Sequence, residues 1–230
     1  MFNLEFEFVQ EPFPHVVIDN FLDCELVESL NKDFPLDLVR NSEMPGRKKL
    51  SKRNKVREKI ALSDSWEEFI SLLDNKEFVM NLMKKSKPIL SEQSRIDFSN
   101  PIRFRKSQTY QKDPNCFFLD YDISEASTGY QREIHHDNDN RLISFLYHLN
   151  DADISGGRLG VFESTEDTVH SRQNPKNVTL KEFIDHKKNR MIIFVSNKIS
   201  YHSVEQITDC KVPRRFVYGA ITHCGPGVWK

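Results

Sequence analysis

Residues 134–150 read Ile-His-His-Asp-Asn-Asp-Asn-Arg-Leu-Ile-Ser-Phe-Leu-Tyr-His-Leu-Asn, a polar segment that runs directly into an apolar, strand-like one. His135 and Asp137 stand two residues apart, and this spacing projects both side chains to the same side of an extended backbone. Neutral imidazole and carboxylate together suit iron, zinc or manganese. Two ligands from one strand edge leave room for a third ligand and for exchangeable positions, as a reactive metal requires. His136 is the competing ligand, but two positions after it stands Asn138, which supplies no carboxylate.

The chain after Pro101 alternates short apolar segments with polar turns. The strand candidates are residues 102–105, 116–121, 129–134, 141–149, 158–162, 190–195 and 215–222. Short strands without helical periods between them predict an antiparallel sandwich or barrel. Residues 163–189 are polar, and we expect them to form a surface loop near the mouth of the sandwich, with one helical turn over 180–185.

Residues 1–100 are expected to add a strand and helices to this core. Residues 13–22 are predicted to form a β-branched strand, and Asp23 is suited to cap the helix that follows. A capping-box pattern at Ser65 predicts a second helical region that extends to about Lys85. These helices are most simply scaffold elements that pack on the sheet.

The segment 46–59 is strongly basic, with eight Lys and Arg residues against the single Glu58. Few apolar residues interrupt it, so it is predicted to be a solvated, mobile loop. The functional alternative is a site of contact for an anionic substrate or partner.

The bulk composition is that of an ordinary globular protein. The 230 residues are 38% hydrophobic and 29% charged, which predicts one domain over 1–230 with a sizeable core. The formal net charge of −1 and the lack of a long apolar run make nucleic acid and membrane unlikely partners. The four scattered cysteines predict free thiols in a reducing compartment, and the opening residues do not resemble a signal peptide. We therefore expect a cytoplasmic protein.

Two later segments supply further candidates for the site. His202 follows the strongly apolar segment 191–195 and a turn, so it can complete a two-histidine, one-carboxylate facial triad with His135 and Asp137. Arg214 and Arg215 begin another apolar strand. An arginine that points into a sheet sandwich implies an anion as its partner, whereas the other arginine would lie in solvent.

An ordered series of short motifs now resembles a known family. The motifs are residues 129–134, His135 with Asp137, and residues 141–150, 156–159, 189–194, 201–204 and 214–216. In this order they resemble the Fe(II)- and 2-oxoglutarate-dependent dioxygenases, in the branch that contains the prolyl 4-hydroxylases. The resemblance covers 101–222 and extends to 11–35, whereas 40–100 matches nothing in the family.

The resemblance implies a mainly β fold with helical additions (α+β). Its core would be a double-stranded β-helix, or jelly-roll, over 101–225, with the N-terminal helices packed outside. His135, Asp137 and His202 would ligate Fe(II). Arg215, chosen over Arg214 because related hydroxylases place the basic residue immediately before an aromatic residue, would bind the distal carboxylate of 2-oxoglutarate. His148 stands where many members have a tyrosine that helps to bind the same carboxylate.

The implied reaction is hydroxylation of an unactivated C–H bond, with O2 and 2-oxoglutarate consumed, succinate and CO2 released, and ascorbate as a candidate reductant. Asp137 favours hydroxylation over halogenation, because a halide would need its coordination position. The substrate is left open between a peptidyl proline and a small molecule such as an amino acid. The alternative function is a cupin-like metal- or ligand-binding jelly-roll without 2-oxoglutarate chemistry.

Overall fold

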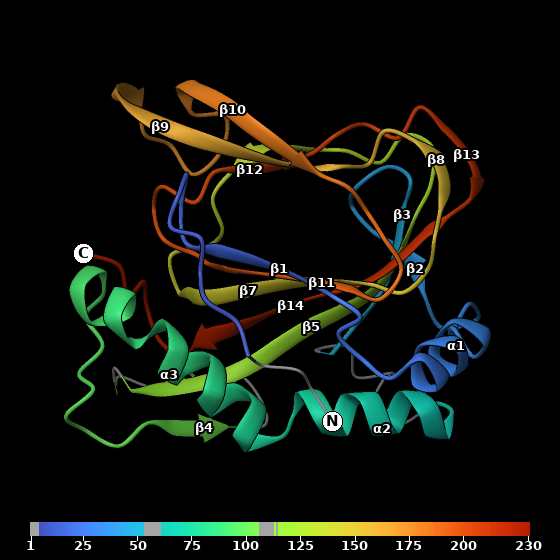
Figure 1. The fold of residues 1–230 in the computed structure, drawn as a ribbon, viewed down its shortest axis with the longest axis horizontal. Coiled ribbons are helices and arrows are strands. Elements are labelled where there is room, and N and C mark those ends of the chain that lie inside the picture. The colour runs from blue at the N-terminus through green and yellow to red at the C-terminus, as the bar shows by residue number, and fades with distance from the viewer. Residues whose placement is uncertain (1–4, 53–60, 106–112, 114) are drawn as a thin grey trace.

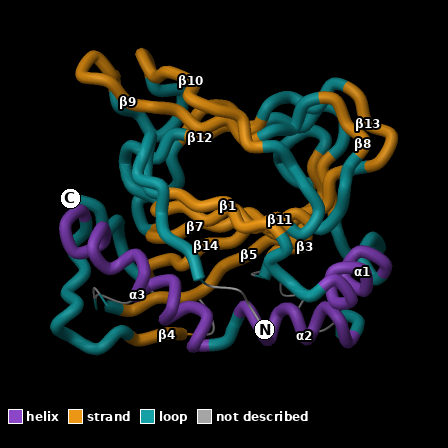
Figure 2. The backbone as a smooth tube through the Cα atoms, viewed as in Figure 1, coloured by secondary structure: helices purple, strands orange, loops and turns teal. Residues whose placement is uncertain are grey.

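Two β-sheets face each other, and helices cover the outer face of the larger sheet in the computed structural model of the protein (Figure 1). The structure describes residues 5–52, 61–105, 113 and 115–230. Figure 2 makes the three layers visible, with orange strands above and in the middle and purple helices below. Within the described ranges, no helix has both the length and the apolar character needed to cross a membrane.

The larger sheet has eight strands within the described residues. Its order is β1 (His15–Asp19), β11 (Arg190–Val195), β7 (Arg141–His148), β14 (Arg214–His223), β5 (Cys116–Ala126), β3 (Arg47–Ser51) and β2 (Arg40–Asn41). The short β4 (Arg103–Arg105) pairs with β5 in parallel, and the other pairs of this sheet are antiparallel.

The smaller sheet closes the sandwich from the other side. It runs β10 (Lys176–Ile184), β9 (Leu159–Val169), β12 (His202–Val204) and β6 (Arg132–His135), while β8 (Asp153–Ser155) and β13 (Asp209–Val212) form a separate pair. From β5 onward the chain alternates between the two main sheets, because β5, β7, β11 and β14 lie in one and β6, β9 and β12 in the other. This alternation is a double-stranded β-helix, so the predicted fold class is confirmed.

Strand β7 explains why the core has two layers. Successive strand residues point to opposite faces, and the seven residues from Leu142 to His148 are all buried. Phe145 and Tyr147 face the helices, where they contact Phe78 and Phe69 at ring-centroid distances of 6.5 and 5.6 Å. Leu146 faces the interior of the sandwich together with other apolar residues. A strand that is apolar on both faces is therefore required at this position.

The helices of the described chain are α1 (Cys24–Lys32), α2 (Asp64–Leu73) and α3 (Lys76–Gln93). The predicted cap of α1 is confirmed, since the Asp23 carboxylate accepts a hydrogen bond from the Glu25 backbone N–H at 2.9 Å. The predicted cap of α2 at Ser65 is wrong, because Ser63 occupies that position. Helix α3 continues beyond the predicted end and carries Pro88 inside it.

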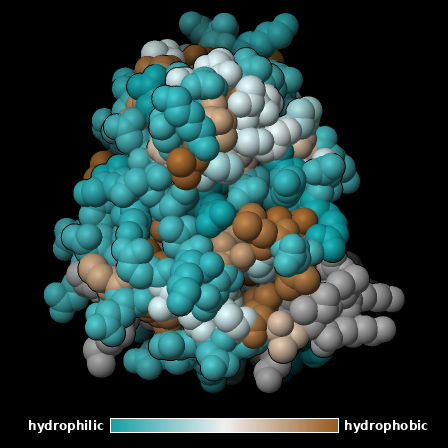
Figure 3. Space-filling view, turned by 90° about the vertical axis from the view of Figure 1, so that its right-hand side faces the viewer, coloured by the Kyte–Doolittle hydropathy of each residue, from teal (hydrophilic) through white to brown (hydrophobic). Residues whose placement is uncertain are grey.

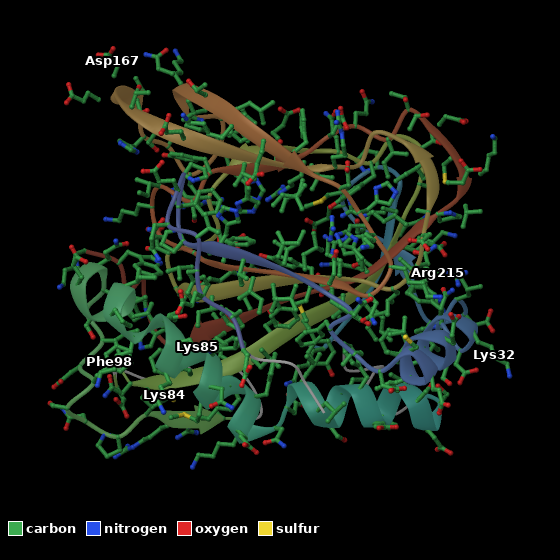
Figure 4. All side chains as sticks on the ribbon, in the orientation of Figure 1. Lys32, Lys84, Lys85, Phe98, Asp167 and Arg215 are labelled. Carbon is green, nitrogen blue, oxygen red and sulfur yellow. The ribbon has the colours of Figure 1, made fainter. Side chains whose placement is uncertain are left out.

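The insertion 163–189 is not the predicted loop. Strands β9 and β10 form a long hairpin across most of it, and the predicted helical turn over 180–185 is wrong because β10 continues to Ile184. Asp167 lies at the outer end of this hairpin (Figure 4). Pairing with β9 satisfies the backbone groups on one edge of β10, which explains how a polar segment is held in a strand.

Part of the basic segment 46–59 forms a strand. Residues 47–51 form β3, which pairs with β5, so the predicted loop is wrong over this part. Residues 53–60 lie outside the described residues. The surface seen in Figure 3 is mainly hydrophilic, with its largest apolar patch at the centre right and smaller apolar spots elsewhere.

Candidate active site

The three predicted metal ligands meet where two strands of the smaller sheet pair. His135 ends β6, His202 begins β12, and the two histidines lie directly opposite each other in the antiparallel register. Asp137 follows two residues after the end of β6. One ligand atom from each side chain lies within 4.8 Å of the others, and all three residues are buried. The cluster therefore offers two imidazoles and one carboxylate, the donor set of a facial iron site.

Nδ1 of each imidazole is held by a backbone carbonyl, so Nε2 is the atom that would bind a metal ion. His135 Nδ1 lies 2.8 Å from the Glu133 carbonyl oxygen, and His202 Nδ1 lies 2.9 Å from that of Ser200. An Nδ1–H donated in this way leaves the Nε2 lone pair for a metal ion. Burial lowers the pKa of His135 to about 3, with a further contribution from His202, and burial also lowers the pKa of His202. Both rings are thus in the neutral, metal-binding form at neutral pH.

The Asp137 carboxylate is held by three side chains from the larger sheet. Tyr218 Oη donates to its two oxygens at 2.9 and 2.8 Å, Ser144 Oγ donates at 2.5 Å, and Arg141 Nη1 donates at 3.0 Å. Burial alone would raise the pKa of Asp137, but Arg141 and the two histidines stabilise the charged form and leave that pKa below its ordinary value. The carboxylate is therefore ionised and fixed in orientation before any metal binds.

His136 lies outside the cluster even though it adjoins His135. Its Nδ1 is 2.8 Å from the Asp137 carbonyl oxygen, and its side chain lines a separate surface depression with Asp139 and His170. The two neighbouring histidines point to different places because they follow each other along an extended backbone.

The cluster opens into a cavity of about 200 Å³ between the two sheets, with Arg214 on its wall. Arg214 begins β14 and is only 1% exposed. Its Nη1 donates to the Gly157 carbonyl oxygen, and the ring of Phe216 lies 4.5 Å from its Cζ atom. Its Nε and Nη2 have no hydrogen-bond partner among the described residues. Burial lowers the pKa of Arg214 to about 10, so the guanidinium remains charged at neutral pH.

A buried guanidinium with two unpaired N–H donors favours binding of a carboxylate, because an unpaired charge in the protein interior costs free energy. The cavity therefore joins a candidate metal-binding cluster to a candidate carboxylate-binding arginine.

Comparison with known proteins agrees with this geometry. Residues 117–222, which hold the whole cluster and Arg214, match the 2OG-Fe(II) oxygenase superfamily. The chain contains a 2OG-Fe(II) oxygenase domain. No curated protein sequence matches the chain.

Solved structures show the fold of this oxygenase domain. A prolyl-4-hydroxylase from Pseudomonas putida aligns with a TM-score of 0.55 and 12% identity, over 91% of this chain and 92% of that one. An oxidoreductase of the 2OG-Fe(II) oxygenase family from Burkholderia pseudomallei aligns with a TM-score of 0.54 and 11% identity, over 93% and 86% of the two chains. The oxygenase domain thus has a prolyl 4-hydroxylase-like fold.

The predicted register of the two arginines is wrong for the oxygenase domain. Arg215 points away from the cavity, where its Nε donates to the Glu125 carboxylate at 3.2 Å and its Nη1 donates to Asn31 at 3.1 Å. Figure 4 shows Arg215 beside α1. Arg214, Phe216 and Tyr218 share the cavity-lining face of β14. Because residues on both faces of β14 are apolar after the arginines, the sequence pattern does not reveal which face is inward.

His148 does not line the cavity of the oxygenase domain. It is 1% exposed, and its ring lies 6.5 Å from that of His186. Burial holds the pKa of His148 well below its ordinary value, and the charge of Arg214 lowers this pKa further. His148 is thus a neutral ring near Arg214. Because it does not line the cavity, it is not placed for the expected contact with a bound carboxylate.

Sequence reasoning missed the residues that hold Asp137. Ser144 and Tyr218 are ordinary strand residues in the sequence, and Arg141 resembles a solvent-facing strand start. The alternation of side chains along a strand places Tyr218 on the same face as Arg214. This identifies Tyr218 as a cavity residue only once Arg214 is known to point inward. The contacts themselves join residues up to 81 positions apart, which no local pattern indicates.

Proposed function

We propose that His135, Asp137 and His202 hold Fe(II) in this oxygenase, and that Arg214 binds the distal carboxylate of 2-oxoglutarate. Fe(II), 2-oxoglutarate and O2 are the cofactor and co-substrates of the superfamily to which residues 117–222 belong. The observation that carries the proposal is the buried Arg214, whose Nε and Nη2 lack partners in the same cavity as the His-Asp-His cluster.

The residues fit the implied groups. Two neutral imidazoles and one ionised carboxylate suit Fe(II), and three protein ligands leave exchangeable positions for a chelating keto acid and for oxygen. Bound Fe(II) supplies the redox chemistry that couples decarboxylation of 2-oxoglutarate, with release of succinate and CO2, to hydroxylation of a C–H bond. A cavity of about 200 Å³ lies below the ~300–1,000 Å³ of typical ligand sites. The co-substrate would therefore lie in a small space, from which it displaces water.

Each side chain then has a defined task. Arg214 orients 2-oxoglutarate by a bidentate contact with its far end, because the planar guanidinium matches a carboxylate. Ser144, Tyr218 and Arg141 hold Asp137 in one orientation. Phe194 and Leu146 line the same cavity and keep its wall apolar. The hydroxylated group is a peptidyl proline or a small molecule such as an amino acid, and ascorbate is a candidate reductant.

Iron-dependent conversion of 2-oxoglutarate to succinate tests this function. We expect the wild-type protein to release succinate, and His135→Asn to abolish both this release and tight Fe(II) binding. His136→Asn is the matched control, because it changes the adjacent buried histidine outside the cluster, and it should retain both. Iron binding without succinate release from the wild-type protein would instead support a cupin-like function.

A further inference from the structure

The cavity wall carries more positive charge than its acidic residues balance. Among the described residues that line it, the cations are Arg47, Lys49, Arg132, Arg141 and Arg214, and the carboxylates are Asp122 and Asp137. Asp120 lies near Arg141 and adds a third carboxylate to the local balance. Five cations against three carboxylates leave an excess of two positive charges around a small, partly apolar space.

The proposed metal and co-substrate do not remove this excess. Fe(II) brings two positive charges and the 2-oxoglutarate dianion brings two negative ones, so together they leave the balance of the wall unchanged. Arg214 would be paired by the co-substrate, and Arg141 is already paired with Asp137 at 3.0 Å. The remaining excess therefore belongs to Arg132 on one sheet and to Arg47 and Lys49 on the other.

Arg132 stands directly beside the metal-binding cluster. It is half-buried on β6, and its Nε lies 3.4 Å from His135 Nε2, its one hydrogen-bond acceptor among the described residues. That Nε2 lone pair is the one a metal ion would take. Once a metal is bound, Arg132 must turn to another acceptor, and no described carboxylate forms an ion pair with it.

Arg47 and Lys49 stand across the cavity on β3 and share one carboxylate. Arg47 Nη2 lies 3.3 Å and Lys49 Nζ lies 3.2 Å from the same oxygen of Asp122. Arg47 is well buried, with an 8% exposed side chain that also donates to Ser124 at 2.8 Å. Lys49 keeps 39% of its side chain exposed, so it is free to reach a ligand at the mouth. One carboxylate cannot neutralise two cations.

We infer that the substrate of this oxygenase is a small molecule with a free carboxylate, which binds between Arg132 and Lys49 while its C–H group faces the metal site. This inference rests on the proposed function. A neutral proline within a peptide would leave Arg132 without a partner next to a metal ion, which is unfavourable for both cations. The small volume of the cavity likewise suits a compact substrate.

Binding of propanoate and of its neutral isostere propanamide tests the inference without turnover. The protein is loaded without oxygen with Fe(II) and saturating 2-oxoglutarate, which occupies Arg214, and the dissociation constants are measured by calorimetry at constant ionic strength. We expect propanoate to bind at least about tenfold more tightly than propanamide, the effect of one charge-assisted hydrogen bond.

Three variants locate the binding site. Arg132→Gln should weaken propanoate binding about tenfold and abolish the preference over propanamide, and Lys49→Gln should weaken it several-fold. Arg103→Gln is the control, because Arg103 lies on β4 with a 74% exposed side chain and outside the cavity lining. Unchanged binding in both Arg132→Gln and Lys49→Gln would mean that the carboxylate only binds the metal, and would overturn the inference.

The two proposals fail in different ways. If the proposed function is wrong, the protein does not form the complex with Fe(II) and 2-oxoglutarate before the probe is added. If only the anionic substrate is wrong, that complex forms but propanoate does not bind, or binds no better than propanamide. Stimulation of succinate release by an end-capped, neutral proline peptide, unaffected by Arg132→Gln, would also overturn the inference.

Discussion

Arg214 and Arg215 are consecutive residues whose guanidinium groups lie on opposite faces of β14. Arg214 is buried in the cavity with two donors unpartnered among the described residues, whereas Arg215 donates to Glu125 and Asn31 on the outside. The register of β14 on β5 produces this arrangement, because it sets Arg214 opposite Ala126 and Arg215 opposite Glu125. One arginine is thus free for a ligand and the other is part of the scaffold.

Replacing these two arginines should separate binding from stability. Arg214→Gln removes the buried guanidinium whose Nε and Nη2 lack partners among the described residues, so the dissociation constant for 2-oxoglutarate should rise at least about tenfold. Arg215→Gln should leave that constant unchanged and cost about 1 kcal/mol of stability, because Glu125 loses its ion pair. Calorimetry with 2-oxoglutarate measures both variants, and the opposite order of effects would restore the register predicted from sequence.

Tyr218→Phe should weaken iron binding without abolishing the fold. The change removes the hydroxyl that donates to both oxygens of Asp137, and loss of such a supporting contact lowers metal affinity about 10- to 100-fold. Tyr147→Phe is the matched control, because its hydroxyl donates to Asn189 at 3.0 Å in the other core layer. Both variants should lose about 1 kcal/mol in urea unfolding, but only Tyr218→Phe should change the Fe(II) titration. Equal iron affinity in the two variants would contradict the role of Tyr218.

Gly219→Ala should destabilise the protein by about 1–3 kcal/mol, the usual effect of an overpacked core. Gly219 pairs with Phe145 on the neighbouring strand, and the ring of Phe145 lies over it. A Cβ atom at Gly219 would lie 2.2 Å from Phe145 Cζ, and the fully buried ring cannot move away. Phe145→Leu should recover part of this loss in a double-mutant cycle, and additive effects of the two changes would argue against the contact.

Asp19→Asn should change stability in a pH-dependent way. The hydrogen bond from Arg190, opposed by burial and supported by Lys187, lowers the pKa of Asp19 from 3.8 to about 2. Because the folded-state pKa lies below the unfolded one, the carboxylate stabilises the protein fully above pH 3.8, and this contribution is lost as the pH falls to about 2.

Urea unfolding of the wild-type protein and Asp19→Asn should therefore differ at neutral pH and converge below pH 2, where the Asp19 carboxyl is protonated in the folded protein as well. A difference that is constant across this range would mean that the Asp19–Arg190 pair does not act through charge.

The sequence alone determined the features that depend on local order. A strand pattern with period two placed His135 and Asp137 on one side of the backbone, and the strand that precedes His202 indicated the third member of the cluster. The ordered motifs from 101 to 222 were sufficient to predict the double-stranded β-helix and the class of enzyme. Asp23 capped α1 as predicted, because a cap is satisfied within three residues.

Which side chains face the cavity depends on contacts between distant segments of the chain. The inward position of Arg214 depends on the pairing of β14 with β5 and β7, and a shift by one residue would have exchanged it with Arg215. The basic residues 47–51 and the polar residues 176–184 form strands because distant partners satisfy their backbone groups. The hydrogen bonds from Tyr218 to Asp137 likewise join segments that meet only in the folded chain. The local sequence pattern indicates the period of a strand. Which face of the strand points inward, and which strands it pairs with, depend on contacts between residues far apart in the sequence.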